Sequence, residues 1–561
     1  MRPANKTIIY QVMPRWFGNT HSVRRKNGTI NENGVGKFSA FTPQVLAEIR
    51  DLGVTHIWYT GVIEHATQTD YSQYGIRRDH PAVVKGRAGS PYAIKDYYDI
   101  DPDLADHVPD RMAEFEALVQ RTHDAGMKVI IDFVPNHVAR QYGSDVRPPH
   151  VHDLGQNDNI SKAFDPNNNF YYLTNQPFIC CTDDNFSDTA YSEYPAKATG
   201  NDCFSSSPGP SDWYETVKLN YGIDLMNGWK TYYDPPPDTW LKMRDILLFW
   251  AGKNVDGFRC DMAEMVPVEF WKWVIPQIKA AADVCFIAEI YKPDRYRDFI
   301  YRGQFDYLYD KVGLYDTLRA VITGHAPAGA ITGCWQAIED IREHILFFLE
   351  NHDEQRIASD FFAGSGQAGY PGMIVAATLY TNPLLIYSGQ EFSERGMDEE
   401  GFSGIDGRTS IFDYWSLDTI RNWLSRLDGG LLKDYQRELY QAYTRLLHIV
   451  ASEPAISKGD FFDLMYVNYD NPHLDTNRQY VFLRKFDREV ILIAANFDSS
   501  EKNIQINIPP AAFQYLHIPD NQEVICTDLF TGERKTDVLT SACPFRMTAP
   551  GHSGKLLKFI Y

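Results

Sequence analysis

The run Met127–Val134 constrains the fold more than any other stretch, because it is almost continuously apolar over the length of a strand. Apolar residues recur at helical spacing before it, between Met112 and Val119, and Gly126 marks the end of that helix. A strand this apolar is buried on both faces, which is typical of a parallel sheet covered by helices. The pattern therefore predicts an α/β fold.

The same alternation of apolar strand and helical segment recurs along most of the chain. Helices are predicted over Pro43–Leu52, where Gly53 follows as a stop, and over Trp240–Ala251. Eight strands are predicted, the number that closes a (β/α)8 TIM barrel. They are Ile8–Met13, His56–Thr60, Met127–Val134, Val255–Arg259, Val284–Ala288, Phe305–Tyr309, Ile345–Leu349 and Leu384–Tyr387.

One connection is far longer than a normal loop between a strand and a helix. Residues 139–235, rich in Asn, Asp, Pro, Ser and Tyr, follow the third predicted strand. They are predicted to form an inserted subdomain on the face where such barrels hold their active sites. The barrel itself is expected over residues 1–138 and 236–450.

The pattern changes again after the last barrel helix. Tyr480–Leu483, Val490–Ala494 and the alternating isoleucines of Ile504–Ile508 are typical of antiparallel strands. Residues 451–561 are therefore predicted to form a C-terminal antiparallel β-sandwich.

Arg259 and Asp261 mark the end of the fourth predicted strand. Side chains on a strand alternate between its faces, so these two should point the same way, with Phe258 and Cys260 on the other face. A guanidinium beside a carboxylate favours the ionised acid and lowers its pKa, as a carboxylate nucleophile requires. A structural ion pair is the alternative that this stretch alone leaves open.

Other predicted strands end in polar residues of the same kind. The third ends in Asp132, Asn136 and His137, the fifth in Glu289, and the seventh in Glu350, His352 and Asp353. The carboxyl ends of barrel strands meet at one rim, so Asp261, Glu289 and Asp353 should converge there. Three carboxylates with no cluster of metal ligands beside them suit acid/base and covalent chemistry on a glycosidic bond.

Net charge and aromatic content indicate the class of ligand. The formal charge is −20, from 54 Lys and Arg against 74 Asp and Glu, and no basic run could follow a phosphate backbone. Nucleic acid is therefore not expected as a partner, and the ligand should be neutral or cationic. Aromatic residues make up 14% of the chain, which suits an ordinary core but also the flat surfaces that bind neutral sugars.

The eight cysteines form no CxxC pair and no Cys/His cluster at zinc spacing, so neither a disulfide framework nor a zinc site is predicted. Cys260 and Cys285 are predicted to be buried thiols. No apolar run reaches membrane-spanning length, and the N-terminus lacks a signal-peptide core. The expectation is a soluble protein that binds no membrane, cytoplasmic, or periplasmic or secreted if a signal peptide has been removed.

Gly364–Gly369 matches the dinucleotide-binding pattern GxGxxG letter for letter. No buried strand leads into it and no acidic residue follows at the distance that a ribose partner needs, so a flexible loop before a helix is predicted instead. The sequence contains no GxSxG, P-loop or HExxH motif.

Taken together, the strand-end stretches resemble the four signature regions of the α-amylase superfamily of retaining glycoside hydrolases. The resemblance covers the whole chain, because the barrel, the insertion after the third strand and the C-terminal sandwich also match. It implies that Asp261 is the nucleophile, Glu289 the general acid and then the base, and Asp353 the residue that stabilises the distorted transition state.

The resemblance also implies substrate-binding residues. Arg259 would hold Asp261 ionised, while His137 and His352 would hydrogen-bond hydroxyls of the glucose that is cleaved. Tyr92, which follows the second strand, matches a tyrosine that stacks on the same glucose in the family. A core tyrosine is the competing interpretation.

One departure from the family concerns calcium. In calcium-dependent α-amylases, a motif before the fourth strand supplies an Asp that ligates calcium together with the Asn of the third-strand motif. Asn136 is present here, but Lys218 takes the Asp position, and an ammonium cannot ligate calcium. No metal or other cofactor is therefore expected. This form is similar to the neopullulanase and cyclomaltodextrinase branch, which implies α-1,4 cleavage and tolerance of α-1,6 bonds or cyclodextrins.

A second departure follows the nucleophile, where Met262–Met265 stands in place of the Lys-His pair that binds the leaving-group side in many α-amylases. Hydrolysis and transfer therefore both stay open. The first hypothesis is a retaining hydrolase of starch-derived α-glucans or maltodextrins, and the second a trehalose synthase or glucanotransferase with the same catalytic residues. The third is an inactive sugar-binding protein on this fold. The intact carboxylates favour the two enzymes.

Overall fold

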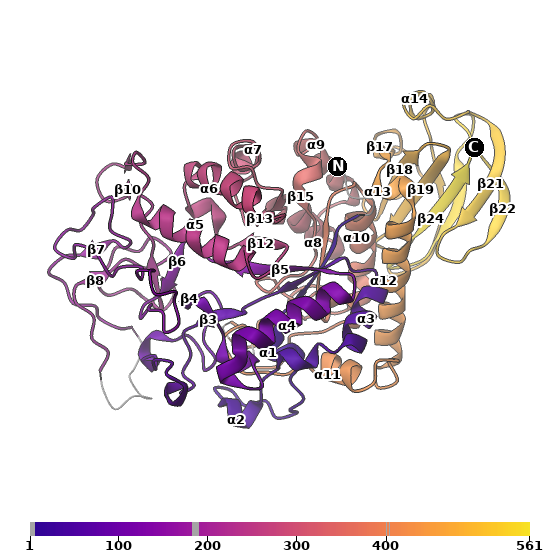
Figure 1. Ribbon diagram of the computed structural model, residues 1–561. Helices are drawn as coiled ribbons and strands as arrows, with labels where there is room; N and C mark the ends of the chain where they lie inside the picture. Colours follow the sequence, from indigo (N-terminus) through magenta and orange to yellow (C-terminus); the bar gives the residue numbers. More distant parts are fainter. Residues whose placement is uncertain (1–5, 182–189, 400, 403) are drawn as a thin grey trace.

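The eight predicted strands all occur in one parallel sheet, and the computed structural model describes residues 6–181, 190–399, 401–402 and 404–561 (Figure 1). In sheet order the strands are β15 (Ile345–Leu346), β14 (Tyr307–Tyr309), β13 (Cys285–Ala288), β12 (Gly257–Cys260), β5 (Lys128–Phe133), β2 (His56–Tyr59), β1 (Ile8–Val12) and β16 (Leu384–Tyr387). A parallel bridge between Phe347 and Leu384 joins the two edge strands. The sheet is thereby a (β/α)8 barrel, as predicted.

The two faces of these strands pack against different partners, which explains why the runs are almost continuously apolar. Alternate residues form one cluster inside the barrel, namely Ile9, Trp58, Ile130, Ile287, Tyr309, Leu346 and Leu385. Their strand neighbours, such as Ile57 and Ile131, belong to the larger cluster between the strands and the helices. Both faces are therefore core, as the sequence pattern predicted.

Helices connect successive strands and cover the outside of the barrel (Figure 1). Helix α3 (Pro43–Asp51) begins at Pro43, and the preceding Thr42 caps it by accepting the N–H of Val45 with its Oγ1 at 3.2 Å. Gly53, with a φ of 109°, follows the end of this helix. The main barrel helices are α3 (Pro43–Asp51), α4 (Arg111–Asp124), α5 (Asp238–Ala251), α6 (Val268–Ala281), α7 (Tyr296–Tyr301), α8 (Asp316–Ile322), α10 (Gly366–Thr378) and α12 (Asp434–Ser452).

Three local predictions were wrong. Strand β15 is shorter than the predicted Ile345–Leu349, because the chain makes only one bridge, at Phe347, beyond Leu346. The segment Gly364–Gly369 is not all loop, since α10 begins at Gly366. That helix is buried on nearly every side, and a Cβ on Gly369 would lie 2.7 Å from Ile357, so its glycines allow close packing. Cys285 is partly exposed rather than buried.

Between β5 and α5 the chain forms a separate lobe on the side of the barrel (Figure 1). Its short antiparallel strands pair as β6 (His137–Ala139) with β9 (Thr216–Lys218), β7 (Tyr172–Leu173) with β8 (Ala196–Lys197), and β10 (Ile223–Asp224) with β11 (Lys230–Thr231). The β6–β9 pair begins immediately after the end of β5, so it carries this lobe over the carboxyl ends of the barrel strands.

The C-terminal region is antiparallel, as predicted. One sheet contains β17 (Asp460–Asp463), β18 (Gln479–Phe486), β19 (Glu489–Asn496), β24 (Ser553–Ile560), β21 (Gln522–Asp528) and β22 (Arg534–Leu539) in that order, and a second pairs β20 (Lys502–Ile506) with β23 (Phe545–Ala549). The rings of Phe545 and Phe559 lie 5.7 Å apart and join the two sheets. Arg484 of β18 is fully buried and donates to the carbonyl oxygen of Thr378 in α10 at 3.2 Å, which ties this region to the barrel.

No helix in the described part of the chain combines the length and hydrophobicity needed to cross a membrane.

Candidate active site

The predicted site residues meet at the carboxyl ends of the barrel strands. Arg259 of β12 lies in register with Asp132 of β5 on one side and Ile287 of β13 on the other, so the ends of these strands share one rim. A cavity of about 360 Å³ opens there, and Tyr92, His137, Asp261, Glu289 and Asp353 line it. The remaining predicted residues, Arg259 and His352, lie directly behind this lining with exposed fractions of 0% and 1%. All seven are therefore brought together.

Arg259 is the centre of the polar network. Its Nη1 donates to Asp261 Oδ1 at 2.7 Å, its Nη2 lies 2.8 Å from Glu289 Oε2, and its Nε donates to Tyr309 at 3.2 Å. Nη1 also lies 3.4 Å from Asp132 Oδ1. The prediction that Arg259 and Asp261 share a face is confirmed, while Cys260 between them is fully buried in the outer core. One guanidinium thus holds two of the three predicted catalytic carboxylates.

The two oxygens of Asp261 differ. Oδ1 accepts from Arg259, whereas Oδ2 is buried and has no hydrogen-bond partner among the described residues. A carboxylate with one anchored oxygen and one unsatisfied oxygen beside a cavity has the form that a nucleophile needs.

Burial changes the electrostatic prediction for Asp261. We expected Arg259 to give this acid a lowered pKa, and Arg259 does act in that direction. Burial is the larger effect, however, and together with the charge of Glu289 it raises the pKa of Asp261 well above its usual value. The expected net lowering was therefore wrong, because one cation faces several buried acids.

Both oxygens of Glu289 are held. Oε1 accepts from the Tyr291 hydroxyl at 2.7 Å, and Oε2 accepts from the N–H of Met262, also at 2.7 Å. Met262 has a φ of 44°, in the left-handed region that costs an ordinary residue about 1 kcal/mol or more, and this turn aims its N–H at the carboxylate. The sequence reasoning missed Tyr291, although its position two residues after Glu289 could have signalled it.

His352 is fixed from both ring nitrogens. Nδ1 lies 2.8 Å from Gln11 Nε2, while Nε2 lies 2.6 Å from the Tyr92 hydroxyl and 3.1 Å from Asp353 Oδ2. Burial, with a smaller contribution from Arg259, places the pKa of His352 well below its usual value, so the ring is neutral. Sequence reasoning also missed Gln11, which no local pattern marks as part of a site.

Tyr92 is a core residue that also reaches the cavity, so its position is compatible with both interpretations that the sequence left open. Its exposed fraction is 8%, it packs in the main core, and its ring stacks on His352 with centroids 5.2 Å apart. It also lines the cavity. The residue is therefore a core tyrosine with one surface toward the site.

His137 lies at the junction between the barrel and the inserted lobe. Its Nδ1 is 3.1 Å from Asn136 Nδ2, and its ring centroid is 5.3 Å from that of Trp213. Burial and the neighbouring charge of Lys218 lower the pKa of His137 to about 3, so the ring is neutral at neutral pH. A neutral imidazole can both donate to and accept from a sugar hydroxyl.

Comparison with known proteins identifies the family. A family model described as "Alpha amylase, catalytic domain" matches residues 11–289, which run from β1 through the ends of β5, β12 and β13 to Glu289. The chain belongs to the α-amylase superfamily.

Two relatives and one solved structure are distantly similar to this chain. The α-amylase MalA of Haloarcula japonica is 26% identical over 404 residues, covering 71% of this chain and 46% of the relative. The α-1,4-glucan:maltose-1-phosphate maltosyltransferase of Cereibacter sphaeroides is 25% identical over 312 residues, covering 54% of this chain and 40% of the relative. The chain thus spans less than half the length of either relative. The crystal structure of a maltogenic α-amylase, AmyB, from Thermotoga neapolitana covers the whole of both chains with a TM-score of 0.63 at 19% identity, which shows the shared fold.

The calcium ion bound by many members of the α-amylase superfamily does not fit the residues found here. Lys218 Nζ donates to Asn136 Oδ1 and lies 2.7 Å from Asp202 Oδ1. The ammonium thereby takes the acceptor oxygen that the amide would give to a cation.

Chelation tests this assignment of Lys218. If Lys218 supplies the positive charge at this position, EDTA should leave the melting temperature unchanged within about 1 °C, because no stabilising ligand is removed. Differential scanning calorimetry with and without the chelator measures this. As a control, Lys218→Met should lower the free energy of unfolding by about 1–3 kcal/mol, because it leaves the buried Oδ1 of Asn136 without its donor. A large drop in melting temperature with EDTA would reveal a calcium site.

Asp353 gives the site a specific dependence of stability on pH. Burial, followed by the charge of Glu289, raises its pKa from 3.8 to about 7. The folded protein then holds this proton more tightly than the unfolded chain does, so the stabilisation is present below about pH 4 and is lost as the pH rises toward 7. Asp353→Asn cannot ionise. Its stability relative to the wild type should therefore rise between about pH 4 and pH 8.

Relative to the wild type, Asp353→Asn should gain about 1–2 kcal/mol in free energy of unfolding over this pH range. This is less than the raised pKa of Asp353 would give for a fully buried acid, because water screens the charge of a partly exposed group. The side chain of Asp353 is 32% exposed. Urea unfolding of both proteins across this pH range measures the gain. Stability curves that stay parallel would show that Asp353 titrates normally.

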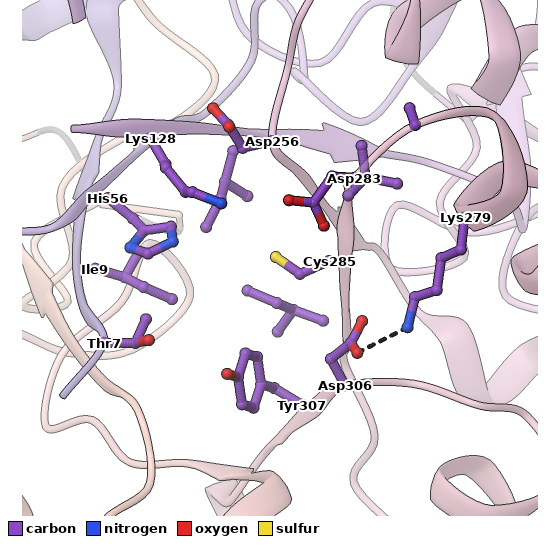
Figure 2. Close-up of a pocket in the computed structure, with 14 residues that line it drawn as sticks. Thr7, Ile9, His56, Lys128, Asp256, Lys279, Asp283, Cys285, Asp306 and Tyr307 are labelled. Carbon is purple, nitrogen blue, oxygen red and sulfur yellow. Dashed lines mark hydrogen bonds and ion pairs between the residues drawn. The ribbon is translucent and has the colours of Figure 1, made fainter. Parts of the chain in front are cut away.

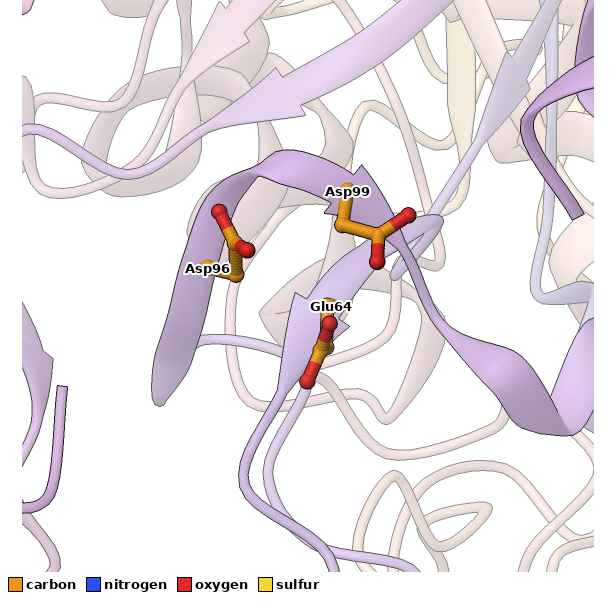
Figure 3. Close-up of side chains that lie close together, drawn as sticks. All are labelled: Glu64, Asp96 and Asp99. Atoms are coloured by element: carbon orange, nitrogen blue, oxygen red, sulfur yellow. The ribbon is translucent and has the colours of Figure 1, made fainter. Parts of the chain in front are cut away.

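Buried acids also cluster away from the site, at Glu64, Asp96 and Asp99 (Figure 3). Asp96 Oδ2 accepts from the Ser144 hydroxyl at 2.6 Å and from the N–H of Asp145 at 2.8 Å, and Asp99 Oδ2 accepts from Arg111 Nε at 2.9 Å. The carboxylates of Asp96 and Asp99 thus already accept hydrogen bonds from protein groups. The cluster is explained as a structural network that joins the chain after β2 to the inserted lobe.

A second cavity, of about 470 Å³, lies at the opposite end of the barrel. Its lining includes the first residues of several strands, His56, Lys128, Cys285 and Tyr307, and Figure 2 shows the ion pair of Lys279 with Asp306, at 2.7 Å, on its wall. Although Cys285 is partly exposed as a residue, desolvation of its thiol raises the pKa to about 12, which makes it a poor nucleophile. In barrels of this kind the amino ends of the strands serve stability, so the chemistry belongs to the other cavity.

Proposed function

We propose that this chain is a retaining α-glucan hydrolase that cleaves α-1,4-glucosidic bonds of starch-derived oligosaccharides or polysaccharides. The observation that carries the proposal is that Arg259 binds two carboxylates, Asp261 Oδ1 at 2.7 Å from Nη1 and Glu289 Oε2 at 2.8 Å from Nη2. The second oxygen of Asp261, Oδ2, has no hydrogen-bond partner among the described residues. A retaining mechanism requires its two carboxyl groups to lie roughly 5 Å apart. Two carboxylates bound to the two terminal nitrogens of one guanidinium can lie at that separation, which supports a retaining mechanism.

The reaction would proceed in two steps. In the first, Asp261 Oδ2 attacks the anomeric carbon while Glu289 gives its proton to the glycosidic oxygen, which leaves with the rest of the chain. In the second, Glu289 takes a proton from water, and the resulting hydroxide displaces Asp261 from the glucosyl-enzyme. Arg259 and Met262 N–H hold Glu289 in place throughout, so the same carboxyl group can act as acid and then as base.

The other predicted residues would bind the sugar. Asp353 is held near His352, and its backbone N–H donates to Asn351 Oδ1 at 2.9 Å, which fixes the loop that carries it. We assign Asp353 to sugar hydroxyls that bind more tightly as the ring distorts. His137, His352 and Tyr92 surround the same space and would complete the binding of the glucose that is cleaved.

Transfer to a second sugar is the alternative within the same chemistry. It needs the same carboxylates and differs only in whether water or a sugar hydroxyl attacks the intermediate. One of the relatives is named a maltosyltransferase, which favours keeping this candidate. An inactive sugar-binding protein is disfavoured by the complete carboxylate set at the rim.

A product profile tests the proposal. The protein is incubated with maltoheptaose, pullulan or a cyclodextrin, and products are separated by chromatography. Short maltooligosaccharides with new reducing ends are expected from maltoheptaose, and the other two substrates report on α-1,6 bonds and on cyclic substrates. Chains longer than the starting substrate, or disaccharides without new reducing ends, would mean that transfer is the main reaction.

A further inference from the structure

Part of the cavity wall carries polar groups that the proposed mechanism does not use. Lys85 and Glu215 both line the cavity that contains Asp261 and Glu289, together with the rings of Trp213 and Phe412. Glu215 immediately precedes β9 of the inserted lobe, and Lys85 follows the short helical turn Pro81–Val83. These groups come from outside the barrel strands, so the carboxylate network on Arg259 does not need them.

Glu215 is a buried acid with an unsatisfied oxygen. Its exposed fraction is 5%, and its Oε2 has no hydrogen-bond partner among the described residues. Burial raises the pKa of Glu215, with the charge of Lys85 acting in the opposite direction. An acceptor left unpaired in a protein wall lowers stability, and such groups call for an explanation such as a ligand that supplies the missing donor.

Lys85 and Glu215, both described in the structure, line the same space but form no ion pair with each other. Its Nζ lies 4.4 Å from the centroid of the Phe412 ring, and no ion pair within 4.0 Å joins it to Glu215 in the described chain. The cavity therefore has a cation donor and an anionic acceptor held apart on its wall. A sugar can satisfy both, because each hydroxyl donates one hydrogen bond and accepts others.

Trp213 connects this pair to the reacting position. Its ring centroid lies 5.3 Å from that of His137, and its backbone has a φ of 46°, in the left-handed region. A strained tryptophan persists only where its surroundings fix it, and such residues are concentrated at functional sites. Its flat ring offers the apolar surface on which a glucose ring packs.

We propose that Glu215 and Lys85 bind a second glucosyl unit, next to the one held by His137 and Tyr92, and so determine chain-length preference. This inference rests on the proposed function. Glu215 accepts from the hydroxyls of that unit, Lys85 donates to them, and Trp213 supports the ring.

The test measures binding by calorimetry in a Glu289→Gln background, which prevents turnover, with maltose, maltotriose and maltoheptaose. Adding Glu215→Gln should raise Kd by on the order of 10- to 100-fold, the effect of losing hydrogen bonds to a charged group. Glu64→Gln is the matched control, because Glu64 is also buried with an unpartnered Oε2 but does not line the cavity. It should leave Kd unchanged within about twofold, whatever its effect on melting temperature.

Two further measurements separate recognition from a structural role. In the active enzyme, Glu215→Gln should raise KM by the same factor and change kcat by less than about threefold, since ground-state binding is lost. Lys85→Gln, at a half-buried position, should raise Kd several-fold even if Glu215→Gln fails to fold.

The outcomes are distinguishable. If the Glu289→Gln protein binds none of these sugars, the proposed function fails, and this inference fails with it. If it binds them and neither Glu215→Gln nor Lys85→Gln weakens binding in a folded protein, only the second sugar position is refuted.

Discussion

Replacing Asp261 with Asn is expected to lower kcat on α-1,4-glucans by at least about 10⁴-fold, because an amide oxygen cannot form the covalent intermediate. The side chain keeps its shape, and Arg259 Nη1, now 2.7 Å from Asp261 Oδ1, can still donate to the amide oxygen. Substrate binding should therefore survive, and the loss should appear in kcat rather than in KM. Steady-state kinetics on maltoheptaose, with binding measured by calorimetry, checks both parts.

Cys260→Ala is the matched control for this variant. Cys260 adjoins Asp261 on the same strand end but is fully buried in the outer core, away from the cavity. It should lower the melting temperature and leave kcat close to that of the wild type. Full activity in Asp261→Asn would rule out Asp261 as the nucleophile, and equal losses in the two variants would point to a folding defect.

Removing the guanidinium of Arg259 is expected to have the second large effect. Arg259→Met should lower the free energy of unfolding by about 3–5 kcal/mol at neutral pH, because it leaves buried carboxylates without their cation. Asp261, Glu289 and Asp132 all lose a partner at once. Activity should fall with stability, since the two carboxylates that we assign to catalysis, Asp261 and Glu289, lose the group that positions them. Urea unfolding and kinetics measure the two effects.

The pH dependence distinguishes this cause from a packing defect. Arg259 lowers the pKa of Asp261 and of Asp132, so without it these two acids take up protons more readily, and the destabilisation should be smaller at pH 5 than at pH 8. Arg259→Lys keeps a positive charge and should be more stable than Arg259→Met, but an ammonium cannot hold two carboxylates in a planar fork, so activity should stay low. A Met variant as stable as the wild type would show that the ion pairs contribute little.

The barrel and most of the site could be predicted from the sequence because both depend on regular spacing. Strands such as Lys128–Phe133 are apolar on both faces and therefore need a covered parallel sheet. In such a barrel the carboxyl end of every strand reaches the same rim, so residues after β5, β12, β13 and β15 converge without any knowledge of the loops.

The parts that escaped prediction depend on side-chain directions and on burial. Gln11 contacts His352 across the barrel, which no local pattern encodes. Tyr291 stands only two residues after Glu289, but the sequence does not show that its side chain turns back to that carboxylate. The pKa of Asp261 is set by competition between Arg259 and desolvation, and the sequence shows the cation but not the depth of burial. Likewise, no sequence pattern distinguishes Glu215 from the other acids of the chain, and only the structure shows that it lines the cavity.

The anomeric form of the first product tests the central claim most directly. Proton NMR, recorded during the first minutes of maltoheptaose cleavage and before mutarotation, resolves the α- and β-anomers of the new reducing end. Double displacement through Asp261 predicts that the α-anomer appears first and the β-anomer only later. Initial release of the β-anomer would mean a single displacement by water and would contradict Asp261 as a covalent nucleophile.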